Sequence, residues 1–150
     1  MAILETGINI GNRNLVEIKY YSSTDVLDPN LRAGFLSALE SFTTEVFGDD
    51  INVVSLKSFK LVCFCELVAL PGDIENNTHP LLSYAIVEKE TDSEIVKRLL
   101  QEITNNFLNR YSLNDIFGKK EKYFRKFNTR IDEIMGDLKM KTEDRFKSLL

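Results

Sequence analysis

The chain has 150 residues, of which 43% are hydrophobic and 28% charged, and its formal net charge is −4. These are the proportions of one folded globular domain that can bury a core without metal or disulfides, and the negative net charge argues against binding to nucleic acid. No apolar run approaches the roughly 20 residues of a membrane-spanning helix, and the first residues lack the order of a secretory signal, so we expect a single cytoplasmic domain over 1–150.

Two β-rich runs open the chain. They are residues 2–10 and 14–22, and Gly11-Asn12 lies between them. A Gly/Asn turn between alternating runs is typical of an antiparallel hairpin. The expected faces are Ala2, Leu4, Ile8 and Ile10 in the first strand, and Val16, Ile18 and Tyr20 in the second.

Residues 29–47 are expected to form the first helix, which begins after Asp28-Pro29 and ends at Gly48. Asp is a good N-cap, Pro suits the first helical position, and Gly supplies the left-handed stop. One apolar stripe would face the sheet, and a second row would lie beside it. Either both rows belong to the core, or Leu36 and Phe47 border an exposed groove beside strand 51–56, where a partner binds. The stripe is Leu31, Phe35, Leu39, Phe42 and Val46, and the second row is Leu36, Thr43 and Phe47.

Three further β-rich runs follow, at residues 51–56, 59–70 and 81–88. The last two are apolar on both faces, which is typical of strands in the interior of a sheet with cover on each side. The residues between Pro71 and Pro80 are expected to be a polar loop.

The C-terminal part is predicted to be helical. Thr91 to Glu94 has the spacing of a capping box, and a stripe follows it in a helix over 93–111. Residues 112–118 are predicted to be a break, and 119–150 a basic C-terminal helix with one apolar face. The stripe of the first of these helices is Ile95, Leu99, Ile103 and Phe107, broadened by Val96, Leu100 and Leu108.

The resulting order of elements is β-β-α-β-β-β-α-α. It satisfies every stripe if a five-stranded antiparallel sheet is sandwiched between the first helix on one face and the two C-terminal helices on the other. The predicted fold class is therefore α+β.

This order, which begins on a strand hairpin, resembles the longin domain of the longin and roadblock superfamily. A roadblock domain would normally begin with a helix, and this chain does not. The likeness is greatest in segments that look like the second strand, first helix and following hairpin of small archaeal-type longin proteins: LVEIKYYSSTD, LRAGFLSALESFTTEVFGDDINVVSL and KLVCFCELV.

Longin domains are binding platforms in vesicle-trafficking proteins, adaptor subunits and complexes that regulate small GTPases. The resemblance implies a non-catalytic platform for a small GTPase or trafficking partner. It also implies pairing, either as a homodimer or with another longin or roadblock protein. In the family's usual strand order the strands 15–21 and 51–56 are outermost. The second of these, INVVSL, carries no charge and includes Val53 and Val54, so it is the expected pairing edge.

A search for chemistry favours a protein that is not an enzyme. The chain has no phosphate loop, no dinucleotide fingerprint and no nucleophile elbow. We expect neither a cofactor nor a metal, because Cys63 and Cys65 suit a buried strand and the single histidine, His79, lies in the expected loop. The alternative function is a ligand-sensing or cytoskeleton-binding module of the PAS or profilin kind, which would need a cavity lined with polar groups.

Charge is unevenly distributed along the chain. Residues 1–118 hold 9 Lys/Arg and 17 Asp/Glu, a net charge of −8, whereas residues 119–150 hold 10 and 6, a net charge of +4. Two interpretations stay open for this basic run: a solvated helix face, or a docking patch for acidic lipid or an acidic partner at a membrane surface. The run GKKEKYFRKFNTR concentrates this charge in Lys119, Lys120, Lys122, Arg125, Lys126 and Arg130. The partner-binding residues expected in this patch are Lys119, Lys120, Lys122 and Arg125.

Overall fold

The computed structural model describes residues 3–11, 13–20, 52–56, 59–70, 72 and 77–139, with the backbone alone at 52–54, 56, 137 and 139. The predicted helix 29–47, with Leu36 and Phe47, lies outside the described residues.

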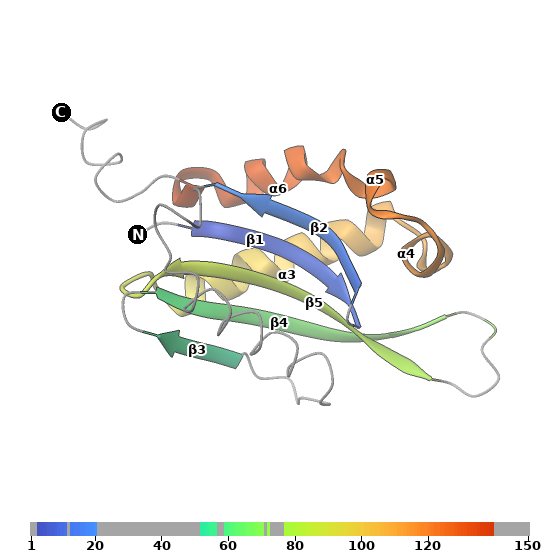
Figure 1. Ribbon diagram of the computed structural model, residues 1–150, viewed down its shortest axis with the longest axis horizontal. Coiled ribbons are helices and arrows are strands. Elements are labelled where there is room, and N and C mark those ends of the chain that lie inside the picture. The colour runs from blue at the N-terminus through green and yellow to red at the C-terminus, as the bar shows by residue number, and fades with distance from the viewer. Residues whose placement is uncertain are drawn as a thin grey trace.

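The strands form one antiparallel sheet in the order β2-β1-β5-β4-β3. The predicted N-terminal hairpin is confirmed, and Gly11 in its turn has a φ of +57°, a value that favours glycine. The strands at the two edges are β2 and β3, as expected for the runs 15–21 and 51–56 (Figure 1). The strand bounds are β1 Ile3–Ile10, β2 Arg13–Lys19, β3 Asn52–Leu56, β4 Phe59–Ala69 and β5 Thr78–Glu88.

The strands β4 and β5 lie in the interior of the sheet, as their sequences predict, and they are buried on both faces except in the second half of β4, where Leu67 is 42% exposed. Val62 and Ala85 belong to the hydrophobic core that the helices cover. Their neighbours Leu61 and Ile86, on the other face, are each only 1% exposed. Alternation along a strand sends successive side chains to opposite faces, so burial of both sets requires apolar residues throughout.

The first strand departs from its predicted face pattern. Its register with β5 shifts between Ile3 and Glu5, and a bulge of this kind reverses the alternation of the residues on one side of it. Ile3 therefore joins Ile8 and Ile10 in the core, and the predicted set of Leu4 with these isoleucines is wrong. Ala2 lies outside the described residues.

The predicted fold, a five-stranded sheet between one helix and two C-terminal helices, needs correction, although the class is α+β. Four strands of 7 to 11 residues, β2-β1-β5-β4, form the main part of the sheet, and β3 adds a short edge of five residues. Within residues 89–139, four α-helices follow the last strand where two were expected. They are α3 Ser93–Arg110, α4 Leu113–Gly118, α5 Glu121–Phe124 and α6 Phe127–Met135, with a 3₁₀ helix η1 at Gly136–Lys139.

The helices described here share one face of the sheet. α3 packs on β4 and β5, whereas α5 and α6 pack on β2, and α6 also contacts α3 (Figure 1). None of the helices in this part of the chain is long and apolar enough to cross a membrane.

The helix α3 confirms the predicted range but corrects its cap and its face. The N-cap is Asp92, whose side chain accepts a hydrogen bond from the Glu94 N–H at 2.9 Å, so Thr91 is not the capping residue. Ile95 is 42% exposed. The first half of the predicted stripe is therefore replaced by Val96 and Leu100, which were expected to broaden it. Its second half, Ile103 and Phe107, is buried as predicted, together with Thr104.

The predicted break at 112–118 and the predicted single helix from Lys119 are both wrong. Ser112 caps α4 by accepting from the Asp115 N–H at 3.1 Å. The turn at Arg125-Lys126 then separates α5 from α6, and its hydrogen bonds join residues three apart. Such a turn brings side chains three apart onto one side, which buries Phe124 and Phe127 together.

Candidate functional site

A basic pocket lies between the start of β2 and the connection from α4 to α5. Its cavity volume is about 460 Å³. All four basic residues of the predicted patch line it, joined by Arg13 from β2. The lining is Arg13, Asn14, Gly118, Lys119, Lys120, Glu121, Lys122 and Arg125. The structure therefore gathers the predicted patch into one concave site.

Arg13 holds the two sides of the basic pocket together. Its Nη2 donates to the carbonyl oxygens of Ile116 and Lys119 at 2.8 and 2.9 Å, and its Nη1 donates to the Phe117 carbonyl at 3.0 Å. These carbonyls belong to the C-terminal end of α4, where the last turn of a helix lacks its own donors. A cation is also favoured there by the helix dipole.

Sequence reasoning missed Arg13. It is between 103 and 106 residues away from the carbonyls that it binds, and an isolated arginine at the start of a strand gives no signal of such a contact. Only the packing of the helices beside β2 brings it to the basic patch.

The basic residues are presented by a short extended link. Lys119 and Lys120, at the end of α4 and the start of α5, both have extended backbone angles. The Nζ of Lys119 lies 5.4 Å from the centroid of the Tyr123 ring, a geometry typical of a cation–π contact. Tyr123 is 46% exposed, and its hydroxyl donates to the Asp115 carboxylate at 3.2 Å. This hydrogen bond raises the pKa of Tyr123.

An aromatic cluster anchors the link from below. Phe124 is fully buried, and its ring centroid lies 4.9 Å from that of Tyr111 and 5.4 Å from that of Phe107. Rings at these separations pack with favourable geometry. Because Phe124 fixes one side of α5, the neighbouring charged residues are held on its solvent side.

The pocket concentrates positive charge. Five of its lining side chains are cationic and one, Glu121, is a carboxylate. Lys119, Lys120, Lys122 and Arg125 are all exposed, and none of them forms an ion pair among the residues that the structure describes. The arrangement can attract and hold an anion.

The second predicted surface, the edge at β3, is at the opposite side of the sheet from the basic pocket (Figure 1). Val53 pairs with Val62 and Val54 with Leu61, and the structure describes only the backbone at these two valines. No described strand pairs with the outer edge of β3. The predicted contact residues therefore belong to two separate surfaces.

The cysteines are free thiols, Cys63 buried and Cys65 half-buried. Burial raises the pKa of both thiols, which disfavours the reactive thiolate. His79 is exposed and lies at the start of β5, rather than in the predicted loop, with its ring 5.1 Å from that of Phe117. Within the described ranges no three His, Cys, Asp or Glu residues group as metal ligands.

No protein-family model matches the sequence, and no curated protein matches it. The geometry of the two surfaces is therefore the basis for assigning a function.

Proposed function

We propose that this protein is a non-catalytic interaction platform of the longin type, which binds a small GTPase or a vesicle-trafficking partner at the β3 edge of its sheet. The same edge would serve in pairing with a second copy or a related domain.

The observation that carries the proposal is the position of β3. It pairs with β4 on one side, and no described strand pairs with it on the other. An outer strand offers a row of backbone N–H and C=O groups to a partner strand. The run INVVSL carries no charge to repel such a strand, and the outer position is the one that the longin resemblance implies.

The described core supports a platform over a ligand sensor. Two of its buried hydroxyls bond to each other: Ser83 Oγ and Thr104 Oγ1 are 2.6 Å apart, and Thr104 also donates to the Leu100 carbonyl at 2.9 Å. A sensor would aim such groups into a cavity. Here Ser83 and Thr104 are satisfied by the protein itself, and among the described residues only the Thr91 hydroxyl is buried without a hydrogen-bond partner.

The test is direct binding to the small GTPases of the source organism, each immobilised in its GDP-bound and GTP-bound states. The variant Ser55→Lys places a charge on β3 at an exposed position, and edge lysines are a common device against strand pairing. The expected result is that at least one GTPase binds the wild-type protein and that Ser55→Lys weakens the interaction by about tenfold or more, equivalent to about 1.4 kcal/mol.

Ser55→Thr is the matched control, since it keeps the strand and adds no charge. It should bind as the wild type does. If a bound GTPase tolerates both substitutions equally, the β3 edge is not the contact surface, and if no small GTPase or trafficking protein binds, the proposed function is wrong.

A further inference from the structure

The positive charges that line the basic pocket outnumber its negative charges. Five cations share it with Glu121 alone, although the whole chain has a net charge of −4. Like charges at close range repel one another. On α4, the Asp115 carboxylate accepts a hydrogen bond from Tyr123. An anionic ligand would relieve the repulsion.

The frame of the pocket is built before a ligand arrives. Arg13 is fixed by its three carbonyl acceptors, and these bonds leave its Nε–H and one Nη1–H without an acceptor among the described residues. Buried Phe124 fixes α5 on the other side. A frame held in this way loses little further conformational entropy when a ligand binds. By contrast, a loose surface run of lysines has no fixed shape to recognise a ligand.

The size of the pocket fits a small phosphorylated group rather than a single ion. Its volume of about 460 Å³ is in the range of small-molecule sites. A second cavity of about 200 Å³ adjoins it and shares Asn14, Glu121 and Arg125. A phosphate monoester presents three strong acceptor oxygens and a charge near −2, which matches several lysine and arginine donors at once.

Tyr123 indicates where the phosphate comes from. Its half-exposed ring does not line the pocket, but it lies beside Lys119, which does. Tyrosine has an apolar ring and a polar hydroxyl, and it is therefore enriched at the boundary between lipid and water. A basic pocket with such a ring beside it fits the surface of an acidic bilayer.

From these observations we propose that the basic pocket binds the phosphate monoester of an acidic phospholipid headgroup, with Arg13, Lys120 and Lys122 as its principal ligands. This site is on the opposite edge of the sheet from β3. The test of the phosphate site is therefore independent of whether a partner binds at β3.

The experiment measures binding of the full chain to three probes. The first is phosphatidylcholine vesicles with phosphatidic acid, a monoester. The second is vesicles with the same surface charge made from phosphatidylglycerol, a diester. The third is soluble pyrophosphate. Vesicle binding is measured by co-flotation, and pyrophosphate binding by calorimetry. We expect the phosphatidic acid vesicles to bind most tightly, and pyrophosphate to compete with them.

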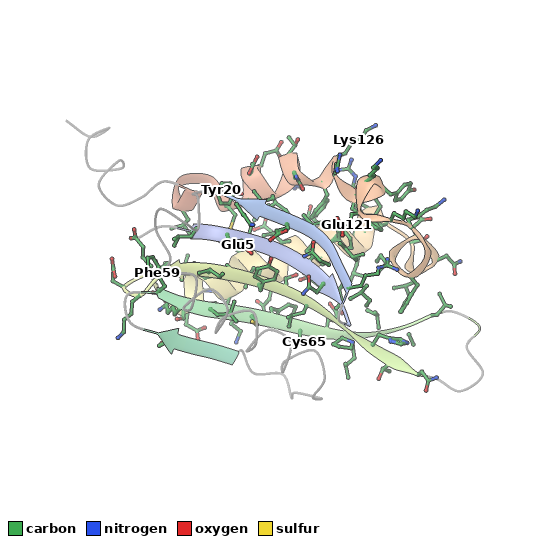
Figure 2. The ribbon with its side chains drawn as sticks, viewed as in Figure 1. Glu5, Tyr20, Phe59, Cys65, Glu121 and Lys126 are labelled. Atoms are coloured by element: carbon green, nitrogen blue, oxygen red, sulfur yellow. The ribbon has the colours of Figure 1, made fainter. Side chains whose placement is uncertain are left out.

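Two lysines inside the pocket are compared with one outside it. Lys126 is a neighbour in the same basic run but does not line the pocket, and Figure 2 shows it at the outer side of the helical layer, whereas Glu121 lies close to β2. Lys120→Gln and Lys122→Gln should each weaken binding about fivefold. Lys126→Gln removes the same charge and should weaken it less. These side chains are exposed, so the variants should keep the wild-type melting temperature.

Glu121→Gln tests the pocket in the opposite direction. It removes the one carboxylate of the lining and should tighten binding to phosphatidic acid vesicles and to pyrophosphate. A general attraction between a basic surface and a membrane would also increase, but equally for both lipids. If the proposed site binds a phosphate monoester, the gain in affinity should be larger for the phosphatidic acid vesicles than for the phosphatidylglycerol vesicles.

Several outcomes would overturn the proposal. Equal binding to both vesicle types, with Lys126→Gln as harmful as Lys122→Gln, would show a nonspecific charged surface. Binding to pyrophosphate without vesicle binding would keep the phosphate site and exclude the lipid as its source. Failure to bind all three probes would exclude a phosphate site altogether.

Discussion

The hydroxyl of Tyr20, at the end of β2, donates a hydrogen bond of 2.7 Å to the Asp132 carboxylate on α6. This bond joins the edge strand β2 to α6, the last α-helix described. Arg13 lies at the other end of β2. Two long-range polar contacts therefore hold β2 to the helical layer: Arg13 to α4 at one end, and Tyr20 to α6 at the other.

Tyr20→Phe should lower the free energy of unfolding by about 1–2 kcal/mol, because it removes a half-buried hydrogen bond to a carboxylate. Burial, and then the bond to Asp132, raises the pKa of Tyr20 well above its ordinary value of 10.0. The neutral phenol is thus favoured in the folded state. Its contribution is complete below about pH 10 and is lost as pH rises toward the folded value. Denaturant titrations from neutral to alkaline pH should show a steeper loss of stability in the wild type than in Tyr20→Phe, and parallel profiles would contradict this assignment.

Arg13→Gln should destabilise the protein by about 1–2 kcal/mol, since it leaves three carbonyl oxygens at the end of α4 without their donor. Chemical denaturation is the measurement. Arg98→Gln, at an exposed position on α3, removes the same charge and is the control. Equal stability of the two variants would mean that the contact between β2 and α4 contributes nothing.

Ile86→Ala should cost about 2–5 kcal/mol, as do other large-to-small changes in a packed core. Ile86 is 1% exposed. Phe64 is only partly buried against the core. Phe64→Ala should therefore lower the free energy of unfolding by less than the same substitution at a fully buried phenylalanine would. Thermal or urea unfolding of both variants gives the order, and a near-neutral Ile86→Ala would show that this face of β5 is not packed.

Self-association through β3 should be visible by sedimentation velocity at micromolar concentrations. The uncharged outer strand favours pairing with a second copy. Ser55→Lys is expected to shift the population toward monomer, whereas Ser55→Thr leaves it unchanged. A wild-type protein that stays monomeric at high concentration would remove this edge as a dimer contact.

Leu36→Asp and Phe47→Asp test the predicted groove beside the first helix, which lies outside the described residues. If these side chains anchor a partner, each variant should keep its melting temperature and lose partner binding. If they belong to the core, a thermal melt of each variant will show a large loss of stability before any partner is known.

Much of the sheet could be predicted from sequence, because successive side chains of a strand point to opposite faces. The burial of each face therefore shows in the sequence as a pattern with a period of two residues. The apolar runs in β4 and β5 predicted interior strands, and the Gly11 turn predicted the hairpin. The face of β1 could not be predicted, since a bulge between Ile3 and Glu5 depends on its pairing with β5. The exposure of Ile95 in the first turns of α3 could likewise not be predicted, since it depends on what the helix packs against, whereas Ile103 and Phe107 are buried as predicted.

The basic pocket could likewise be predicted only in part from the sequence. The basic residues in the run from Lys119 to Arg125, and the burial of Phe124 among them, could be predicted from the sequence alone. That this run folds into a concave site depends on long-range packing, because the turn at Arg125-Lys126 and the guanidinium of Arg13 act through contacts with β2 and the core. Local patterns reach as far as one helix or strand, while a pocket is made by segments that the chain brings together from more than a hundred residues apart.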